Sequence, residues 1–154
     1  MIHRMYRVAV AAALIAVSLA AFAMPSSDEP SVSDRIANAH KAIKSQNWST
    51  AMFELNQALR DEPRNPEVHN LLGYTYRMKA SPDLAKSFEH YNIALRYNPN
   101  HKATLEYMGE AYLMDSKPEE ADKLLVRLET VCGNRACPEY QELFKAIADY
   151  RAKK

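Results

Sequence analysis

The sequence predicts an all-α protein, a right-handed α-solenoid of helix–turn–helix repeats, and an internal repeat is the main reason. Two short stretches, Leu72–Tyr76 and Met108–Tyr112, are versions of one another offset by 36 residues. Each has a glycine followed three residues later by a tyrosine, inside a segment that otherwise predicts helix. A helical glycine costs about 1 kcal/mol relative to alanine, so two at equivalent positions indicate close contact with a neighbouring helix. Self-similarity at a fixed period is typical of helical-repeat arrays.

The second half of each repeat recurs with the same offset. Small and large apolar positions spaced by four, three and one residues lie on one face of a helix, and the proline that follows ends it. These positions are Ala51, Leu55, Ala58, Leu59 and Pro63, repeated as Ser87, Tyr91, Ala94, Leu95 and Pro99.

A third copy fixes the underlying period. Twelve residues separate Gly109 from Ala121, whereas fourteen separate Gly73 from Ser87. The middle copy therefore has two extra residues in its turn, near 79–83, and the basic period is 34 residues. The third copy consists of Leu105, Met108, Gly109, Tyr112, Ala121, Leu125 and Leu128, with Gly133 in the place of the terminating proline.

A 34-residue unit with Gly-x-x-Tyr, then Ala, an aromatic or leucine, Ala-Leu and a closing Pro resembles the tetratricopeptide repeat (TPR) family. The resemblance covers about residues 32–135 and implies repeats at about 32–65, 66–101 and 102–135 within a domain at 34–152. Repeat packing is expected at Leu72, Gly73, Tyr76, Ala94, Met108, Gly109, Tyr112 and Ala121. The first helix has Arg35, Asn38, Ala39 and Ala42 where larger apolar residues are usual, so we expect loose packing there.

A further helix is expected at about 138–152. Tyr140, Leu143, Phe144 and Ile147 repeat the spacing of the third copy's first helix. Solenoids need a terminal unit with a polar outer face, so we expect this segment to be a capping helix over the last repeat.

The first 23 residues have the pattern of a secretory signal peptide. Arg4 and Arg7 precede an apolar stretch from Val8 to Ala20, and Ala21-Phe22-Ala23 is a small-x-small cleavage site. The apolar run is shorter than the roughly 20 residues that span a bilayer. We therefore expect cleavage after about Ala23, no membrane insertion afterwards and a periplasmic location. An uncleaved anchor remains the alternative. Residues 24–33 are polar and are expected to form a disordered leader.

Export decides how the two cysteines are interpreted. In an oxidising compartment Cys132 and Cys137 are most simply a disulfide, because Gly133 lets the short loop close. Two alternatives stay open: a redox couple, which usually needs Cys-x-x-Cys at a helix N-terminus, and metal binding, for which no histidine is near. The paired-cysteine ending also resembles that of small exported bacterial TPR proteins.

Charge and motifs argue against several classes of function. Without residues 1–23, 18 basic and 19 acidic side chains remain, and no basic stripe interleaved with aromatics suggests nucleic acid as a partner. We find no phosphate-binding loop, nucleophile motif or metal-ligand motif, so we expect no enzyme activity, no cofactor and no metal. His69 occupies a position that is usually aromatic or leucine, which indicates a core histidine.

The TPR resemblance implies a concave groove lined by the first helix of each repeat. We expect Arg77 and Lys44 to face Glu106 and Glu110, and Tyr74 and Arg77 to be binding hot spots that can be replaced with little loss of stability. The groove positions are Ile36, His40, Ile43, Lys44, Asn70, Tyr74, Arg77, Met78, Glu106, Glu110, Leu113 and Met114.

These expectations favour a non-catalytic adaptor that binds a protein or peptide. Two other roles stay open. One is a periplasmic assembly or maturation helper that holds a client, which a methionine-containing groove would suit. The other is a structural component of an envelope complex.

Overall fold

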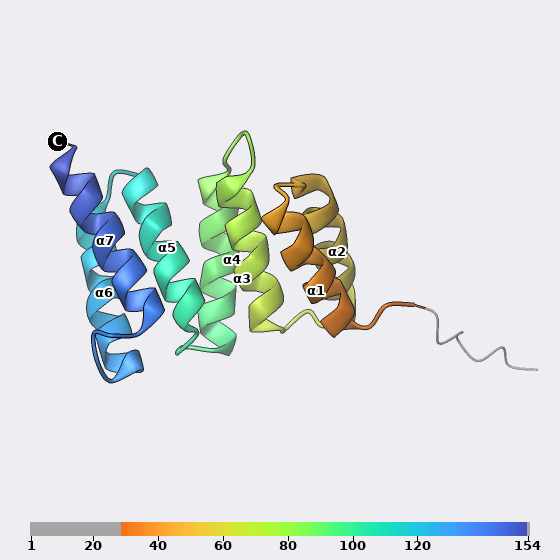
Figure 1. The fold of residues 1–154 in the computed structure, drawn as a ribbon. Helices are drawn as coiled ribbons and strands as arrows, with labels where there is room; N and C mark the ends of the chain where they lie inside the picture. The colour runs from red at the N-terminus through yellow and green to blue at the C-terminus, as the bar shows by residue number, and fades with distance from the viewer. Residues whose placement is uncertain (1–28, 154) are drawn as a thin grey trace, which may run out of the picture.

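The fold is all-α, with seven helices over the part of the chain that the computed structural model describes, residues 29–153 (Figure 1). They follow one another without strands in that range. The helices are α1 (Val32–Lys44), α2 (Trp48–Asp61), α3 (Pro66–Met78), α4 (Leu84–Tyr97), α5 (Lys102–Met114), α6 (Pro118–Cys132) and α7 (Pro138–Ala152).

The helices pair as helix–turn–helix units. The closest partners are α1 with α2, α3 with α4, and α5 with α6, while α7 packs against both α5 and α6. Each first helix also contacts the next first helix along the chain, whereas the second helices α2, α4 and α6 do not contact one another within the described range. The layer of α1, α3, α5 and α7, which we call the inner layer, is therefore more closely spaced than the outer layer of α2, α4 and α6 (Figure 1).

Local sequence explains where the helices begin and end. Ser31 and Asp34 form a capping box at the start of α1, and Asn65 caps α3 through the backbone N–H groups of Glu67 and Val68. Prolines occupy the first position of α3, α6 and α7. Each of α2 and α4 ends two residues before a proline, as the repeat predicts.

The turn lengths confirm the expected insertion. The turns 45–47 and 115–117 each have three residues between paired helices, and the turn 79–83 has five. The two extra residues of the middle repeat therefore lie in the turn 79–83, as the sequence comparison of the repeats predicted.

The core is divided into clusters along the array, each shared by neighbouring helices. One cluster contains Ala39, Leu55 and Leu72, a second is built around Tyr91 and Met108, and a third joins Leu105 to Leu143. The predicted packing residues behave as expected: Leu72, Gly73, Ala94, Met108, Gly109 and Ala121 are buried, and Tyr76 and Tyr112 are half-buried.

The expectation of loose packing in the first repeat is wrong. Ala39 and Ala42 of α1 are buried, so this end packs closely through small residues rather than loosely. Arg35 is also buried, and its guanidinium lies 3.5 Å from Glu54 and 3.8 Å from Asp61, both on α2. A charged side chain paired with the partner helix thus stands where an apolar one is usual.

Most of the N-terminal segment for which we predicted a signal peptide and a leader lies outside the described residues. The signal segment 1–23 and residues 24–28 are not part of the described range. Helix α1 begins at Val32, two residues inside the stretch expected to be a leader, because Ser31 caps it. Among the described helices, none has the length and hydropathy needed to cross a bilayer.

Candidate binding groove on the inner layer

An ion pair between neighbouring first helices is the centre of the candidate site. Arg77 of α3 is only 5% exposed, and its guanidinium lies 2.7 Å from a carboxylate oxygen of Glu110 on α5. Burial lowers the local dielectric, so this pair interacts more strongly than one on the surface. It confirms that Arg77 faces Glu110. Lys44, by contrast, is exposed on α1.

Two tyrosines frame the Arg77 guanidinium. Tyr74 and Tyr107 have ring centroids 4.8 Å apart, and the guanidinium carbon lies 5.3 Å from the first ring and 5.7 Å from the second. These distances are those of cation–π contacts. Tyr107 was not among the predicted groove residues, although its spacing of three residues from Glu110 places both on neighbouring turns of one helix face.

Beside this cluster lies an open pocket of about 440 Å³, where α3, α5 and α7 meet. Arg77, Glu110, Leu113 and Met114, all predicted groove residues, line one side. The capping helix supplies the other side, which the sequence pattern did not indicate because α7 was assigned only a covering role. The residues from α7 and its C-terminal end are Ala146, Asp149, Tyr150 and Lys153.

Carboxylates gather around Glu106 on α5, one turn before Glu110. Burial, together with the carboxylates of Glu110, Glu139 and Glu142, raises the pKa of Glu106 to about 8 from its ordinary 4.5. Glu106 therefore carries a proton for much of the time near neutral pH.

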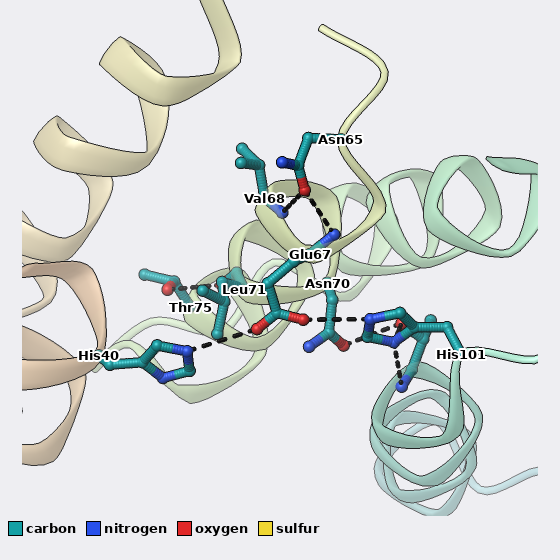
Figure 2. Close-up of polar contacts among 9 residues, drawn as sticks. His40, Asn65, Glu67, Val68, Asn70, Leu71, Thr75 and His101 are labelled. Carbon is teal, nitrogen blue, oxygen red and sulfur yellow. Dashed lines mark hydrogen bonds and ion pairs between the residues drawn. The ribbon is translucent and has the colours of Figure 1, made fainter. Parts of the chain in front are cut away.

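A second polar bridge joins three first helices. Glu67 of α3 lies between His40 of α1, at 3.4 Å, and His101 before α5, at 3.1 Å (Figure 2). His101 caps α5 by accepting the backbone N–H of Thr104 at its Nδ1, so its proton lies on Nε2, which points at Glu67. The inner layer is thus tied together at two levels, by Glu67 and by the Arg77–Glu110 pair.

Several predicted groove residues are not available to a partner. Asn70 is 1% exposed, and its side-chain oxygen accepts a hydrogen bond from Thr104 at 3.0 Å, so it joins α3 to α5 instead of lining open surface. Ile36 and Ile43 pack against the first core cluster. Met78 is exposed at the end of α3 but does not line the pocket.

The burial of Arg77 also corrects the expected consequence of replacing it. A buried, paired guanidinium contributes to stability, because removing either partner leaves an uncompensated charge or a cavity. Arg77→Ala is therefore expected to weaken the fold as well as any binding. Met114, which is 47% exposed and lines the pocket, is the better position at which to test binding.

The cysteines are joined as predicted. A disulfide links Cys132, the last residue of α6, to Cys137, which precedes α7. Gly133 has φ of 72° in the left-handed region, where glycine carries no steric cost, and it ends α6. The disulfide therefore fixes the beginning of the capping helix to the last repeat.

A pair of histidines, one buried and one half-buried, lies on the other side of α3. His69 is buried, as predicted, and its Nε2 lies 3.1 Å from the carbonyl oxygen of Pro63. A carbonyl only accepts, so Nε2 donates and Nδ1 of the neutral ring accepts from Nδ1–H of His90 at 3.0 Å. The Tyr76 ring stacks on His90. Burial, and then the neighbouring His69, lower the pKa of His90 to about 4.

Comparison with solved structures identifies the fold. The chain superimposes on the first TPR domain of the human RPAP3 protein with a TM-score of 0.64, covering 80% of this chain and 97% of that one at 17% identity. This chain has the fold of a TPR domain. Comparisons with protein-family models and with curated sequences find no match. TPR domains generally bind proteins on an extended concave surface, and the fold is typically non-catalytic.

Proposed function

We propose that the protein is a non-catalytic adaptor of the bacterial periplasm that binds a protein or peptide on its inner layer. The observation that carries this proposal is the pocket of about 440 Å³ between α3, α5 and α7. It lies on the side of the TPR fold where successive first helices converge.

The lining of the pocket suits a peptide. Leu113, Met114 and Ala146 offer apolar surface, while Glu110 and Lys153 offer polar groups that can hydrogen-bond a backbone. Ligand sites combine an apolar wall with a few fixed polar groups in this way. The Arg77–Glu110 pair and the two tyrosines hold one wall rigid, which lowers the entropic cost of binding.

Site-specific photocrosslinking tests the proposal in living cells. A photocrosslinking amino acid is placed at Met114 in the pocket and, as a matched control, at Val126, which is 65% exposed on α6 in the outer layer. We expect a discrete crosslinked protein from position 114 and none from 126. Crosslinks from 126 alone would move the binding surface to the outer layer.

One observation favours the alternative of an assembly helper. Met78 and Met114 are both exposed on the inner layer, and methionine adapts to varied apolar surfaces. A helper would bind many apolar peptides weakly, whereas an adaptor would bind one partner. Stable co-purification with an envelope complex that survives Met114→Glu would instead indicate a structural component.

Export is part of the proposal and has its own test. The basic start, the apolar stretch and the small-x-small site support cleavage after about Ala23. N-terminal sequencing of protein from the envelope fraction should find Met24 or a neighbouring residue at the start. Soluble cytoplasmic protein that begins with Met1 would overturn the periplasmic assignment and leave the groove untouched.

A further inference from the structure

A cluster of three metal-ligand side chains lies at the junction of α6 and α7. The sulfur atoms of Cys132 and Cys137 and a carboxylate oxygen of Glu139 all lie within 4.8 Å of one another, and all three residues are half-buried. In the oxidised protein the two sulfurs are bonded to each other. Nothing in the disulfide itself requires a carboxylate beside it.

We propose that the reduced protein binds a divalent cation that prefers sulfur ligands, zinc(II) above all, through Cys132, Cys137 and Glu139. The two cysteines are separated by four residues, a spacing within the range used by zinc-binding cysteine pairs. Their Cα atoms are 6.1 Å apart.

The geometry needs only small adjustments. Tetrahedral zinc with bonds of about 2.3 Å to sulfur and about 2.1 Å to oxygen holds its ligand atoms roughly 3.5–3.8 Å apart. Reduction lets the sulfurs separate to that distance by side-chain rotation. Glu139 is the second residue of α7, so its carboxylate is carried on the same short segment as the thiols. Water completes the fourth position, because the proposed set contains three protein ligands.

The chemistry balances in two steps. A dithiol, which becomes a disulfide itself, or a phosphine, which takes an oxygen atom from water, transfers two electrons to the disulfide. The two sulfurs take up the two protons that the dithiol or the water releases, and two thiols form. Zinc(II) then displaces both thiol protons, because the thiolate is the form that binds metal. Two thiolates and one carboxylate around zinc(II) leave a local charge of −1.

Other contacts keep the segment in place once the disulfide is open. Arg151 of α7 lies 2.5 Å from Asp122 of α6, and Leu143 packs against Gly109. Within the loop, Asn134 accepts the backbone N–H of Ala136 at 2.8 Å. The thiols therefore stay near one another, and the same segment joins α6 to α7 covalently when oxidised and through an ion when reduced.

Cobalt(II) is a suitable probe, because thiolate ligands give it a charge-transfer absorption. We expect the phosphine-reduced protein to bind one equivalent of cobalt(II) with this absorption, zinc(II) to displace it, and bound zinc(II) to slow alkylation of both thiols. The oxidised protein should show neither effect. Absence of a thiolate–cobalt band in the reduced protein, or identical binding by the oxidised protein, would overturn the proposal.

Glu139→Gln separates the three-ligand site from simple binding by two thiols. It should weaken zinc binding by the reduced protein about 10-fold or more, since even partners outside the ligand set typically contribute 10–100-fold. Glu142→Gln, which removes the same charge from an exposed position one turn further along α7, is the matched control and should bind like wild type. Equal affinities for Glu139→Gln and wild type would overturn the assignment of Glu139 as a ligand.

Discussion

Gly73 and Tyr91 fit together so closely that no other residue at position 73 leaves the tyrosine where it is. A Cβ on Gly73 would lie 2.5 Å from two ring carbons of Tyr91 and 3.1 Å from the backbone oxygen of Ser87. Gly109, its equivalent in the next repeat, meets a different neighbour, since a Cβ there would lie 2.6 Å from the side-chain tip of Leu143 on α7.

The two glycines should therefore respond differently to alanine. Tyr91 is fully buried and rigid, so Gly73→Ala should destabilise the protein by about 1–2 kcal/mol, overpacking exceeding the gain in helix propensity. Leu143 can rotate, so Gly109→Ala should cost about 1 kcal/mol less. Urea unfolding measures both, and a larger loss for Gly109→Ala would contradict the prediction.

Removing the carboxylate at Glu110 should destabilise the inner layer. Glu110→Gln leaves the buried Arg77 guanidinium without its counter-charge, at a cost of about 2–3 kcal/mol in the free energy of unfolding. Lys123→Gln, which breaks the exposed pair with Glu120, is the control and should leave stability unchanged within error. Similar effects of the two substitutions would mean that the Arg77–Glu110 pair is not coupled to folding.

The His69–His90 pair should make the fold sensitive to acid. The pKa of His90 is about 4 in the folded protein and about 6.5 unfolded, so the unfolded chain binds more protons between these values. Stability should therefore fall as pH falls from about 6.5 to 4. Lys86, whose charge also lowers the pKa of His90, adds to the effect, and Glu89 opposes it.

Thermal unfolding of His90→Gln across this pH range provides the measurement. The melting temperature of the variant should depend less on pH than that of wild type, because a glutamine can donate to His69 but does not titrate. An unchanged slope in His90→Gln would assign the acid sensitivity to another group.

The raised pKa of Glu106 should make the stability of the fold depend on pH in the opposite direction, falling as pH rises. Its pKa is about 8 folded and about 4.5 unfolded, so the folded protein binds more protons between these values and stability falls as pH rises through them. Glu106→Gln should raise the melting temperature near pH 8 and leave it unchanged near pH 4. Glu119→Gln, an exposed carboxyl on α6, should do neither. A variant that melts below wild type at both pH values would show that the carboxyl is not strained.

Much of the architecture could be predicted because its signals are local. Each signal acts within one helix or one turn, so it can be recognised from residues that are close together in the sequence. The signals are the glycine–tyrosine spacing, the prolines after α2 and α4 and the longer 79–83 turn. The cysteine pair is equally local, and its disulfide was predicted. Burial of Ala39 and Ala42 in α1 was not predicted, because it depends on how closely α2 packs against α1. The burial of Arg35 likewise depends on its pairing with Glu54 of the neighbouring helix.

The candidate site was only partly predictable, because its exposed and buried side chains are decided by contacts between different helices. The TPR resemblance implied that Tyr74, Arg77 and Glu110 lie on the inner layer, but it could not distinguish a buried side chain from an open one. Asn70 proved to be buried against Thr104, and α7 proved to supply half of the pocket. Such outcomes depend on the distance between helices that are far apart in the chain.

The sequence by itself determined the helices, their pairing into repeats and the residues that pack them, because propensity, capping and periodicity operate over a few residues. Only the tertiary structure decided which groove residues reach solvent, that Arg77 lies between two tyrosines, and that Glu139 lies beside both cysteines. Those relationships come from side-chain packing and electrostatics, which depend on the position and orientation of each helix relative to its neighbours.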